Sequence, residues 1–338
     1  MKSKEIKAIV LAVLAAAFYA CGTPVSKFLL AYTSPAMMAA FLYLGAGTGI
    51  GIMCLIRGRK DDNKEKLGHA DLPFTIGMIV LDIIAPILLM NGVARTAAAN
   101  VSLLNNFEIA ATAAIAFFIF KEKISPAMWA ALFLITLSSL ILSFEGSDSL
   151  HFSAGSIMVI CAAICWGFEN NCTKMISSKS TYEIVILKGL CSGTGALIIA
   201  LVIGEKIPSI AVIGIILLLG FVAYGLSIFT YIRAQGVIGA AKTSAFYALA
   251  PFIGALLSFI ILHEKLSLQY VAGLVIMMIG SFMAAVDTLK YRHSHMHTHT
   301  VYHLHGGRIE KELITHEHDH SHIGPGLAHH HSSKAEER

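Results

Sequence analysis

Charged residues are scarce in this chain of 338 residues, and their scarcity excludes a water-soluble globule. Only 14% of the residues are charged and 56% are hydrophobic, whereas about a quarter of a typical soluble domain is charged. The apolar surface of such a chain has to face the hydrocarbon of a lipid bilayer. The net charge is only +4 and the basic residues are scattered in short loops, which excludes a nucleic-acid partner.

The sequence also lacks a disulfide framework and an enzyme-like constellation. All six cysteines lie in apolar runs, where free cysteine behaves as a small apolar side chain. No loop at an expected membrane face carries a cluster of metal-ligating or acid–base residues, and no long polar segment offers the output domain of a sensor. A membrane-embedded enzyme and a non-transporting membrane protein are therefore the weaker alternatives, and we predict no catalytic residue and no required cofactor.

Long apolar runs dominate what is present. A helix that crosses the hydrocarbon core needs about 20 apolar residues, and ten runs qualify, separated by short connections with Pro, Ser, Gly or charge. The predicted spans are residues 6–29, 35–57, 72–93, 98–120, 126–144, 153–175, 183–203, 208–232, 240–262 and 268–288. Residues 1–21 imitate a secretory signal peptide, but the bulky Phe18-Tyr19 pair before Cys21 favours an uncleaved first span.

Basic residues mark one side of the membrane. Cytoplasmic connections carry the excess of Lys and Arg in membrane proteins. On one side of the predicted spans lie Lys2, Lys4, Lys7, Arg57, Arg59, Lys60, Lys64, Lys66, Lys121, Lys123, Lys174, Lys179, Arg233, Lys290 and Arg292. The other side has only Arg95, Lys206 and Lys265. The sequence thus predicts a multi-pass protein of the plasma or inner membrane with both termini in the cytoplasm.

One stretch of the sequence occurs twice. Residues 97–125 align with residues 239–267 without gaps, and both copies end on Glu-Lys-Ile/Leu-Ser. Because an odd number of predicted spans separates equivalent points, the second copy is expected to be inverted in the membrane. Inverted repeats are a recurring transporter architecture with binding sites near the midplane. Glu122 and Glu264 are then expected at opposite membrane faces, as corners of the scaffold.

The first spans of the two halves are also related, since Tyr19 precedes Lys27 by the same spacing as Trp166 precedes Lys174. With the duplicated Glu-Lys corner, this order resembles the EamA-type branch of the drug/metabolite transporter superfamily over residues 6–288. The resemblance implies an all-α membrane protein of ten helices in two inverted five-helix repeats. It also implies secondary transport, by export or exchange, of small polar metabolites, often amino-acid-like. Tyr19-Ala20 departs from the family's Trp-Gly, which alters the expected cavity wall.

The resulting organisation has three parts. We predict a first repeat over residues 1–147, a second over residues 148–288 and a His-rich cytoplasmic tail over residues 289–338. The expected partners are a small-molecule substrate and the lipid bilayer. Proton coupling and a homodimer are open alternatives.

Ionisable residues inside the spans are the candidate sites, because a charge at the bilayer centre costs roughly 2.5–3.5 kcal/mol on insertion scales. Glu108 shares a helical face with Asn105 and Thr112 in the fourth span. A substrate or proton site and a buried structural hydrogen bond both fit this pattern. Asp82 lies midway along the third span, with Asn91 farther on. If Asp82 and Glu108 are adjacent, they could share a proton and act as a coupling group.

The sixth span carries a second polar group. Trp166, Glu169 and Asn170 lie beside Gly167, which suggests a locally opened helix that lines the site. The alternative is an interfacial pair between Glu169 and Lys174. Lys188, one turn into the seventh span, is expected to snorkel toward the membrane surface.

In the second half, Tyr224 and Tyr247 occupy the positions equivalent to Asp82 and Asn105. A tyrosine at cavity depth can stack on a substrate and donate a hydrogen bond, although a buried tyrosine bonded to a neighbour fits equally. One half would then contribute charge and the other aromatic shape. That asymmetry suits a cationic or zwitterionic substrate.

Histidine is absent from the predicted spans and gathers after them. All sixteen histidines except His69, His151 and His263 lie in residues 293–331. Two runs alternate, and their members are His293, His295, His297, His299, His316, His318, His320 and His322. Four imidazoles on one side of an extended chain suffice to capture Zn²⁺, Ni²⁺, Co²⁺ or Cu²⁺. The tail is expected to be disordered without metal, and it fits metal buffering or sensing, a merely polar tail or metal-linked transport.

Overall fold

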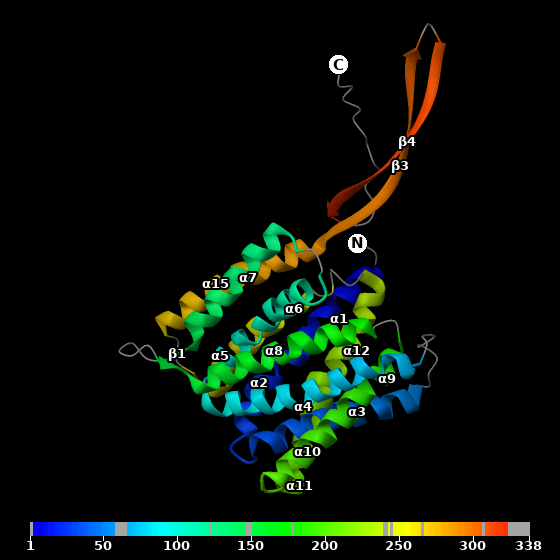
Figure 1. Cartoon of the computed structure of the whole chain (residues 1–338). Coiled ribbons are helices and arrows are strands. Elements are labelled where there is room, and N and C mark those ends of the chain that lie inside the picture. The colour runs from blue at the N-terminus through cyan, green and yellow to red at the C-terminus, as the bar shows by residue number, and fades with distance from the viewer. Residues whose placement is uncertain are drawn as a thin grey trace. The chain divides into compact units, whose positions relative to one another are not determined.

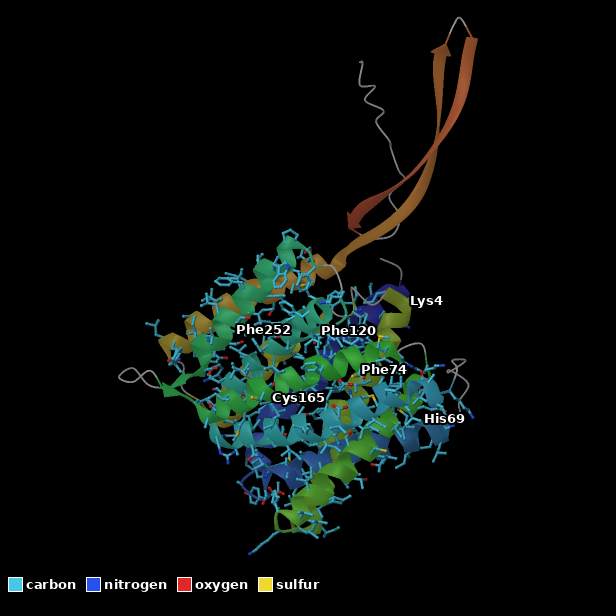
Figure 2. All side chains as sticks on the ribbon, viewed as in Figure 1. Lys4, His69, Phe74, Phe120, Cys165 and Phe252 are labelled. Carbon is cyan, nitrogen blue, oxygen red and sulfur yellow. The ribbon has the colours of Figure 1, made fainter. Side chains whose placement is uncertain are left out.

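The computed structural model describes residues 3–57, 66–121, 124–145, 151–176, 179–238, 243, 246–264, 267–305 and 308–323. The chain divides into two units, Met1–Ala285 and Val286–Arg338. The described part of the first unit is a bundle of helices with one short strand pair, β1 (Phe144–Glu145) and β2 (His151–Phe152) (Figure 1). Side chains fill the space between these helices (Figure 2).

The described helices fall into two sets, one in each half of the chain. The first half contains α1 (Ser3–Ala20), α2 (Gly22–Leu29), α3 (Pro35–Arg57), the short helix η2 (His69–Asp71), α4 (Leu72–Arg95), α5 (Ala98–Leu104), α6 (Phe107–Phe118) and α7 (Pro126–Ser143). The second half contains α8 (Ala154–Met175), α9 (Thr181–Leu187), the π-helical segment η3 (Lys188–Ser192), α10 (Gly193–Val202), α11 (Ile210–Gly220), the π-helical segment η4 (Phe221–Leu226), α12 (Ser227–Ile238), α14 (Ala250–Leu262) and α15 (Leu268–Leu289).

Serine side chains cap the first turn of equivalent helices in the two halves. Ser125 and Ser267 cap α7 and α15 by accepting a hydrogen bond from a backbone N–H three residues on, as N-cap serines do.

Eight of the described segments are long and apolar enough to cross a membrane. They correspond to the first five, the seventh, the eighth and the tenth predicted spans. The sixth predicted span, α8, is long enough, but polar residues fill its C-terminal half. Part of the ninth lies outside the described residues, and its described helix α14 is shorter. The count of ten spans therefore stays a prediction.

The two halves exchange equivalent partners. Helix α4, the third predicted span, packs against α8, the sixth, whereas α1, the first, packs against α12 of the eighth. The first span of each half thus lies on the third span of the other half. Similarly, α3 lies against α10 and α11, and α5 lies against α14. The same pairing therefore recurs between equivalent spans of the two halves.

Three predicted spans are interrupted, at positions that matter for the site. The first breaks at Cys21 between α1 and α2, and the fourth breaks at Asn105-Asn106 between α5 and α6. In the second half, a turn at residues 248–249 precedes α14, close to the position equivalent to Asn106. Irregular backbone at membrane depth is tolerated where it is buried in protein or lines a cavity. Discontinuous helices therefore point to the region between the halves.

Helix α8, in contrast, is continuous, so the expectation of a locally opened sixth span is wrong. Gly167 serves close packing instead, because a Cβ atom there would lie 2.7 Å from the Cβ of Ala111 in α6. The glycine lets two helices approach, and this contact brings the polar residues of α8 beside α6.

Glu264 joins the two copies of the repeated stretch. Its carboxylate oxygens accept hydrogen bonds from the backbone N–H groups of Ala98 and Ala99, at 2.7 and 2.9 Å. The end of the second copy therefore caps the first turn of α5, where the unpaired N–H groups and the helix dipole favour an anion. Glu205 caps α3 in the same way, through Ala36 and Met37. Glu122, the equivalent of Glu264, lies outside the described residues.

We expect Glu264→Gln to lower stability, because the amide keeps one acceptor and turns an NH₂ group toward a backbone donor. Loss of a helix cap costs about 0.5–2 kcal/mol. The measurement is the melting temperature of the purified protein in detergent. Lys206→Gln removes a charge from an exposed position and should leave that temperature unchanged. Equal melting of the parent and Glu264→Gln would contradict the capping role.

The described part of the tail, residues 290–305 and 308–323, is a pair of strands, so the expected disordered tail is not confirmed. Strand β3 (Lys290–His305) pairs antiparallel with β4 (Arg308–Ile323). Alternation with a period of two, together with Thr, Val, Tyr and Ile, suits extended backbone. The same alternation that suggested a metal-binding chain is thus also the pattern of a strand.

Candidate functional site

An ion-paired group lies buried inside the bundle. The ammonium Nζ of Lys188, at the start of η3, lies 3.2 Å from Oδ2 of Asp82 in α4 and 2.9 Å from Oε1 of Glu169 in α8. Asp82 is fully buried and Glu169 is 1% exposed. We call these three residues the ionic cluster. One cation is shared between two buried carboxylates, so each carboxylate depends on the same ammonium group.

Asp82 is held on its other side by two neutral donors. The Tyr43 hydroxyl and the Trp166 indole N–H both donate to Oδ1, at 3.1 and 3.2 Å. Glu169 also accepts a hydrogen bond from Thr173 on its own helix. Buried charge is tolerated only when it is paired and hydrogen-bonded, and here residues of α3, α4, α8 and η3 meet to satisfy that requirement.

Glu108 has a different environment. It lies in the first turn of α6, directly after the break at Asn105-Asn106, and it is only partly buried. Its Oε1 accepts a hydrogen bond of 2.6 Å from the side-chain amide of Asn170, which also donates to Thr112 Oγ1 at 3.3 Å. Glu108 is therefore bonded to a neutral amide, whereas the adjacent α8 carboxylate, Glu169, faces Lys188.

A row of tyrosines runs from the ionic cluster toward the second half. The ring centroids are separated by 5.7 Å for Tyr43–Tyr224, 5.8 Å for Tyr224–Tyr19, 5.7 Å for Tyr19–Tyr247 and 5.2 Å for Tyr247–Tyr231. These separations are typical of edge-to-face and tilted aromatic pairs. Since Tyr43 also bonds Asp82, the row links the charged residues to both halves of the repeat.

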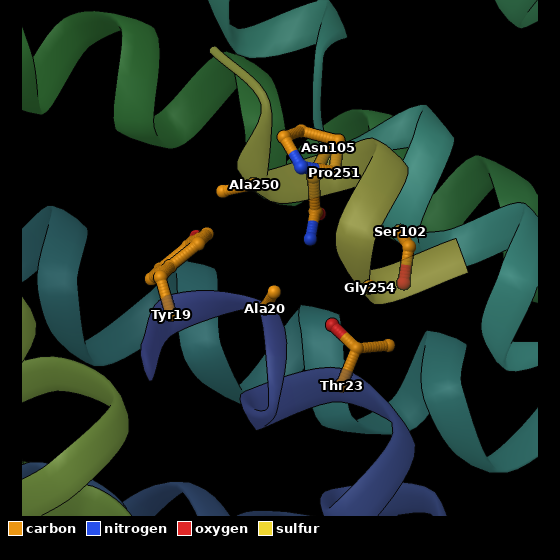
Figure 3. A pocket seen from close by; sticks show the side chains of 8 residues that line it. All are labelled: Tyr19, Ala20, Thr23, Ser102, Asn105, Ala250, Pro251 and Gly254. Atoms are coloured by element: carbon orange, nitrogen blue, oxygen red, sulfur yellow. The ribbon is translucent and has the colours of Figure 1, made fainter. Parts of the chain in front are cut away.

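A pocket opens beside Tyr19, between the first and fourth spans and the start of α14 (Figure 3). Its lining residues are Tyr19, Ala20, Thr23, Ser102, Asn105, Ala250, Pro251 and Gly254. Figure 3 shows Tyr19, Thr23 and Asn105 around the same space. Ser102 Oγ and Asn105 Oδ1 are buried and have no hydrogen-bond partner in the described part of the chain. Both atoms can accept a hydrogen bond from a polar ligand.

The geometry groups most of the predicted site residues. Asp82, Trp166, Glu169, Asn170 and Glu108 lie together on α4, α6 and α8. Tyr224 and Tyr247 belong to the tyrosine row, and Asn105 lines the pocket. Asn91 is set apart, since its Oδ1 accepts a hydrogen bond of 2.7 Å from exposed Arg95 near the end of α4. Asp82 and Glu108 bond to different partners, so the arrangement does not favour a shared proton between them.

Lys188 is the main residue that sequence reasoning misplaced. Its position one turn into the seventh span suggested snorkelling, but its ammonium group points inward to the ionic cluster. Glu169 accordingly pairs with Lys188, and Lys174, its expected partner, is exposed. Tyr43 and Tyr19 were also missed as site residues. The available signal was the charge imbalance, because carboxylates buried in the third and sixth spans require a cation from another span.

Membrane-spanning helices that enclose charged and aromatic side chains beside a pocket define a multi-pass membrane protein of the transporter class. The model of the EamA-like transporter family matches residues 6–144 and 153–286, and the chain belongs to this family. The chain is therefore a transporter rather than an enzyme.

Relatives and a solved structure agree with this assignment. An uncharacterized transporter of Methanothermobacter thermautotrophicus is 25% identical over 288 residues, covering 79% of this chain and 82% of the relative. The uncharacterized transporter YyaM of Bacillus subtilis is 26% identical over 282 residues, covering 77% and 87%. A protein crystal structure with 13% identity shares the fold, with a TM-score of 0.60 over 83% of this chain and 96% of that chain.

Proposed function

We propose that the chain is a secondary transporter that exports or exchanges small metabolites bearing an ammonium group, such as amino acids or polyamines. One observation carries this proposal: Lys188 is shared by Asp82 and Glu169, whereas Glu108 is bonded to the neutral amide of Asn170. The grouped side chains thus hold three carboxylates and one ammonium. A cationic or zwitterionic substrate supplies positive charge that this group lacks, and burial makes that charge complementarity strong.

Glu108 is the carboxylate that we assign to the substrate. It is only partly buried and lies beside Asn105, a pocket-lining residue whose buried amide oxygen has no partner in the described part of the chain. A substrate ammonium would bond to Glu108, its polar groups would reach Asn105 and Ser102, and the tyrosine row would form an aromatic wall.

The coupling step follows from competition at the same carboxylate. A proton and a substrate ammonium each neutralise Glu108, and each lowers the cost of keeping that carboxylate away from water. Exchange of one for the other would drive substrate out as protons enter. The two halves would alternate the access of the site by movement at the interrupted helices. The excess of basic residues on one side supports an orientation with both termini in the cytoplasm, in a plasma or inner membrane.

The decisive experiment is solute counterflow in proteoliposomes with paired substrates. Each amine is tested against an analogue that lacks it, alanine against lactate and putrescine against butanediol. We expect exchange of labelled amine-bearing solutes only. Exchange confined to anions or to the amine-free analogues would overturn the proposal.

Glu108→Gln is expected to reduce that exchange at least about tenfold, the loss that corresponds to 1.4 kcal/mol, because the neutral amide cannot pair with an ammonium. It should also abolish substrate-driven internal acidification, recorded with an entrapped pH-sensitive dye. The matched control is Glu183→Gln, which neutralises a carboxylate at the start of α9 that accepts a hydrogen bond from the Leu67 backbone. Undiminished exchange by Glu108→Gln with normal folding would contradict the assignment.

A further inference from the structure

The hairpin places histidines of its two strands opposite one another. His293 pairs with His320, His295 pairs with His318, and His297 pairs with His316. The same register continues along both strands to the pair of His305 with Arg308. We call these six residues the histidine ladder.

The six ladder residues share one face of the hairpin. Successive side chains of a strand alternate between faces, and each ladder pair is two positions from the next. The intervening pairs are Ser294 with Asp319 and Met296 with Glu317. A register shift of one residue would pair every ladder histidine with a non-histidine. Pairing thus collects histidine on one face and places acidic positions on the other.

The spacing of the ladder suits a metal ion. Directly opposite residues of an antiparallel pair have Cβ atoms about 4.5–5.5 Å apart, and diagonal neighbours are about 7–8 Å apart. Two successive pairs therefore bring four histidine positions within about 8 Å of one another. Zn²⁺ takes four nitrogen or sulfur ligands tetrahedrally, and imidazole also suits Co²⁺, Ni²⁺ and Cu²⁺.

We propose that the histidine ladder binds a divalent transition-metal ion, of which Zn²⁺ is the type, through two adjacent cross-strand histidine pairs. Among the side chains that the structure describes, no group of three or more His, Cys, Asp or Glu is arranged to hold a metal. An isolated two-stranded hairpin is only marginally stable in water. Metal binding adds its free energy to the paired state and fixes the hairpin.

Calorimetric titration of the full-length protein with ZnCl₂, CoCl₂ and MgCl₂ tests this site. The ladder variant H295Q/H297Q/H316Q/H318Q removes two adjacent pairs. The matched control H303Q/H305Q/H329Q/H330Q removes as many histidines from outside the ladder. We expect the parent and the control to bind Zn²⁺ and Co²⁺ equally and not Mg²⁺, and the ladder variant to bind at least tenfold more weakly. Bound Co²⁺ should show the intense visible absorption of tetrahedral coordination.

Two results would overturn the proposal. Equal weakening in the two variants would mean that the histidines bind as an unpaired chain, irrespective of register. Absence of Zn²⁺ binding by the parent protein would exclude the site altogether. Equal melting temperatures of the two metal-free variants would show that a difference in binding does not come from the helix bundle.

Discussion

Lys188→Met is expected to abolish exchange and to destabilise the protein severely. The substitution removes the ammonium that Asp82 and Glu169 share and leaves two buried carboxylates facing an apolar side chain. Removing one partner of a buried ion pair costs about 3–5 kcal/mol, because the remaining charge is uncompensated. The melting temperature in detergent should fall by about 5–10 °C, and counterflow should fall to the level of empty liposomes.

A second substitution separates electrostatics from packing. In Lys188→Met/Asp82→Asn, one of the stranded carboxylates is replaced by a neutral amide that can still accept from Tyr43 and Trp166. The double variant should melt above Lys188→Met, because only one buried carboxylate is then left without its cation. Lys206→Met, at an exposed lysine after α10, is the control and should melt like the parent. If Lys188→Met had the melting temperature and the exchange activity of the parent, the ionic cluster would contribute neither to stability nor to transport.

The carboxylates of this site could be predicted because the cost of a charge in an apolar run is a local property. Asp82, Glu108 and Glu169 each interrupt a run that is otherwise long enough to cross a membrane. Their partners could not be predicted in the same way. Lys188 meets Asp82 and Glu169 only after three separate spans have packed. The position of a residue along a span gives its depth in the membrane, but it does not give the direction in which the side chain points.

The interrupted helices show a similar limit. The break at Cys21 lies three residues before Pro24, which has no N–H to donate to the carbonyl of Ala20 as a residue of a continuous helix would. Gly167, where a locally opened helix was expected, lies in α8 without a break. Glycine has a packing use that local propensity does not reveal. The break at Asn105-Asn106 fits residues whose side chains compete with helical hydrogen bonds.

The repeat was the most informative feature of the sequence, because it is independent of any single residue. It predicted a scaffold role for Glu264, and the cap that Glu264 forms on α5 is such a role. In the tail, alternation predicted an extended chain, but the pairing of that chain depends on a second strand, which the composition does not reveal.

Gly220→Ala is expected to destabilise the protein, although alanine is the better helix former. A Cβ atom at Gly220 would lie 2.0 Å from the carbonyl oxygen of Leu42 in α3, and one at Gly45 would lie 2.2 Å from the carbonyl oxygen of Leu217 in α11. The two backbones therefore touch, as helices in membranes do at small residues. Overpacking costs about 1–3 kcal/mol, and backbone atoms cannot move aside as a flexible side chain can.

Gly214→Ala is the matched control, because it lies on the same helix in open space, with no atom within 4 Å of the added Cβ. There alanine should be neutral or stabilising by roughly 0.5–1 kcal/mol. Gly220→Ala should lower the melting temperature, whereas Gly214→Ala should leave it unchanged or raise it. This difference separates the effect of close packing from that of helix propensity. Equal shifts in the two variants would contradict the close contact at Gly220. Gly220→Ala should also weaken exchange more than its melting temperature implies. The displaced helices carry Tyr43 and, four residues after Gly220, Tyr224. The rings of these tyrosines connect the ionic cluster to the pocket.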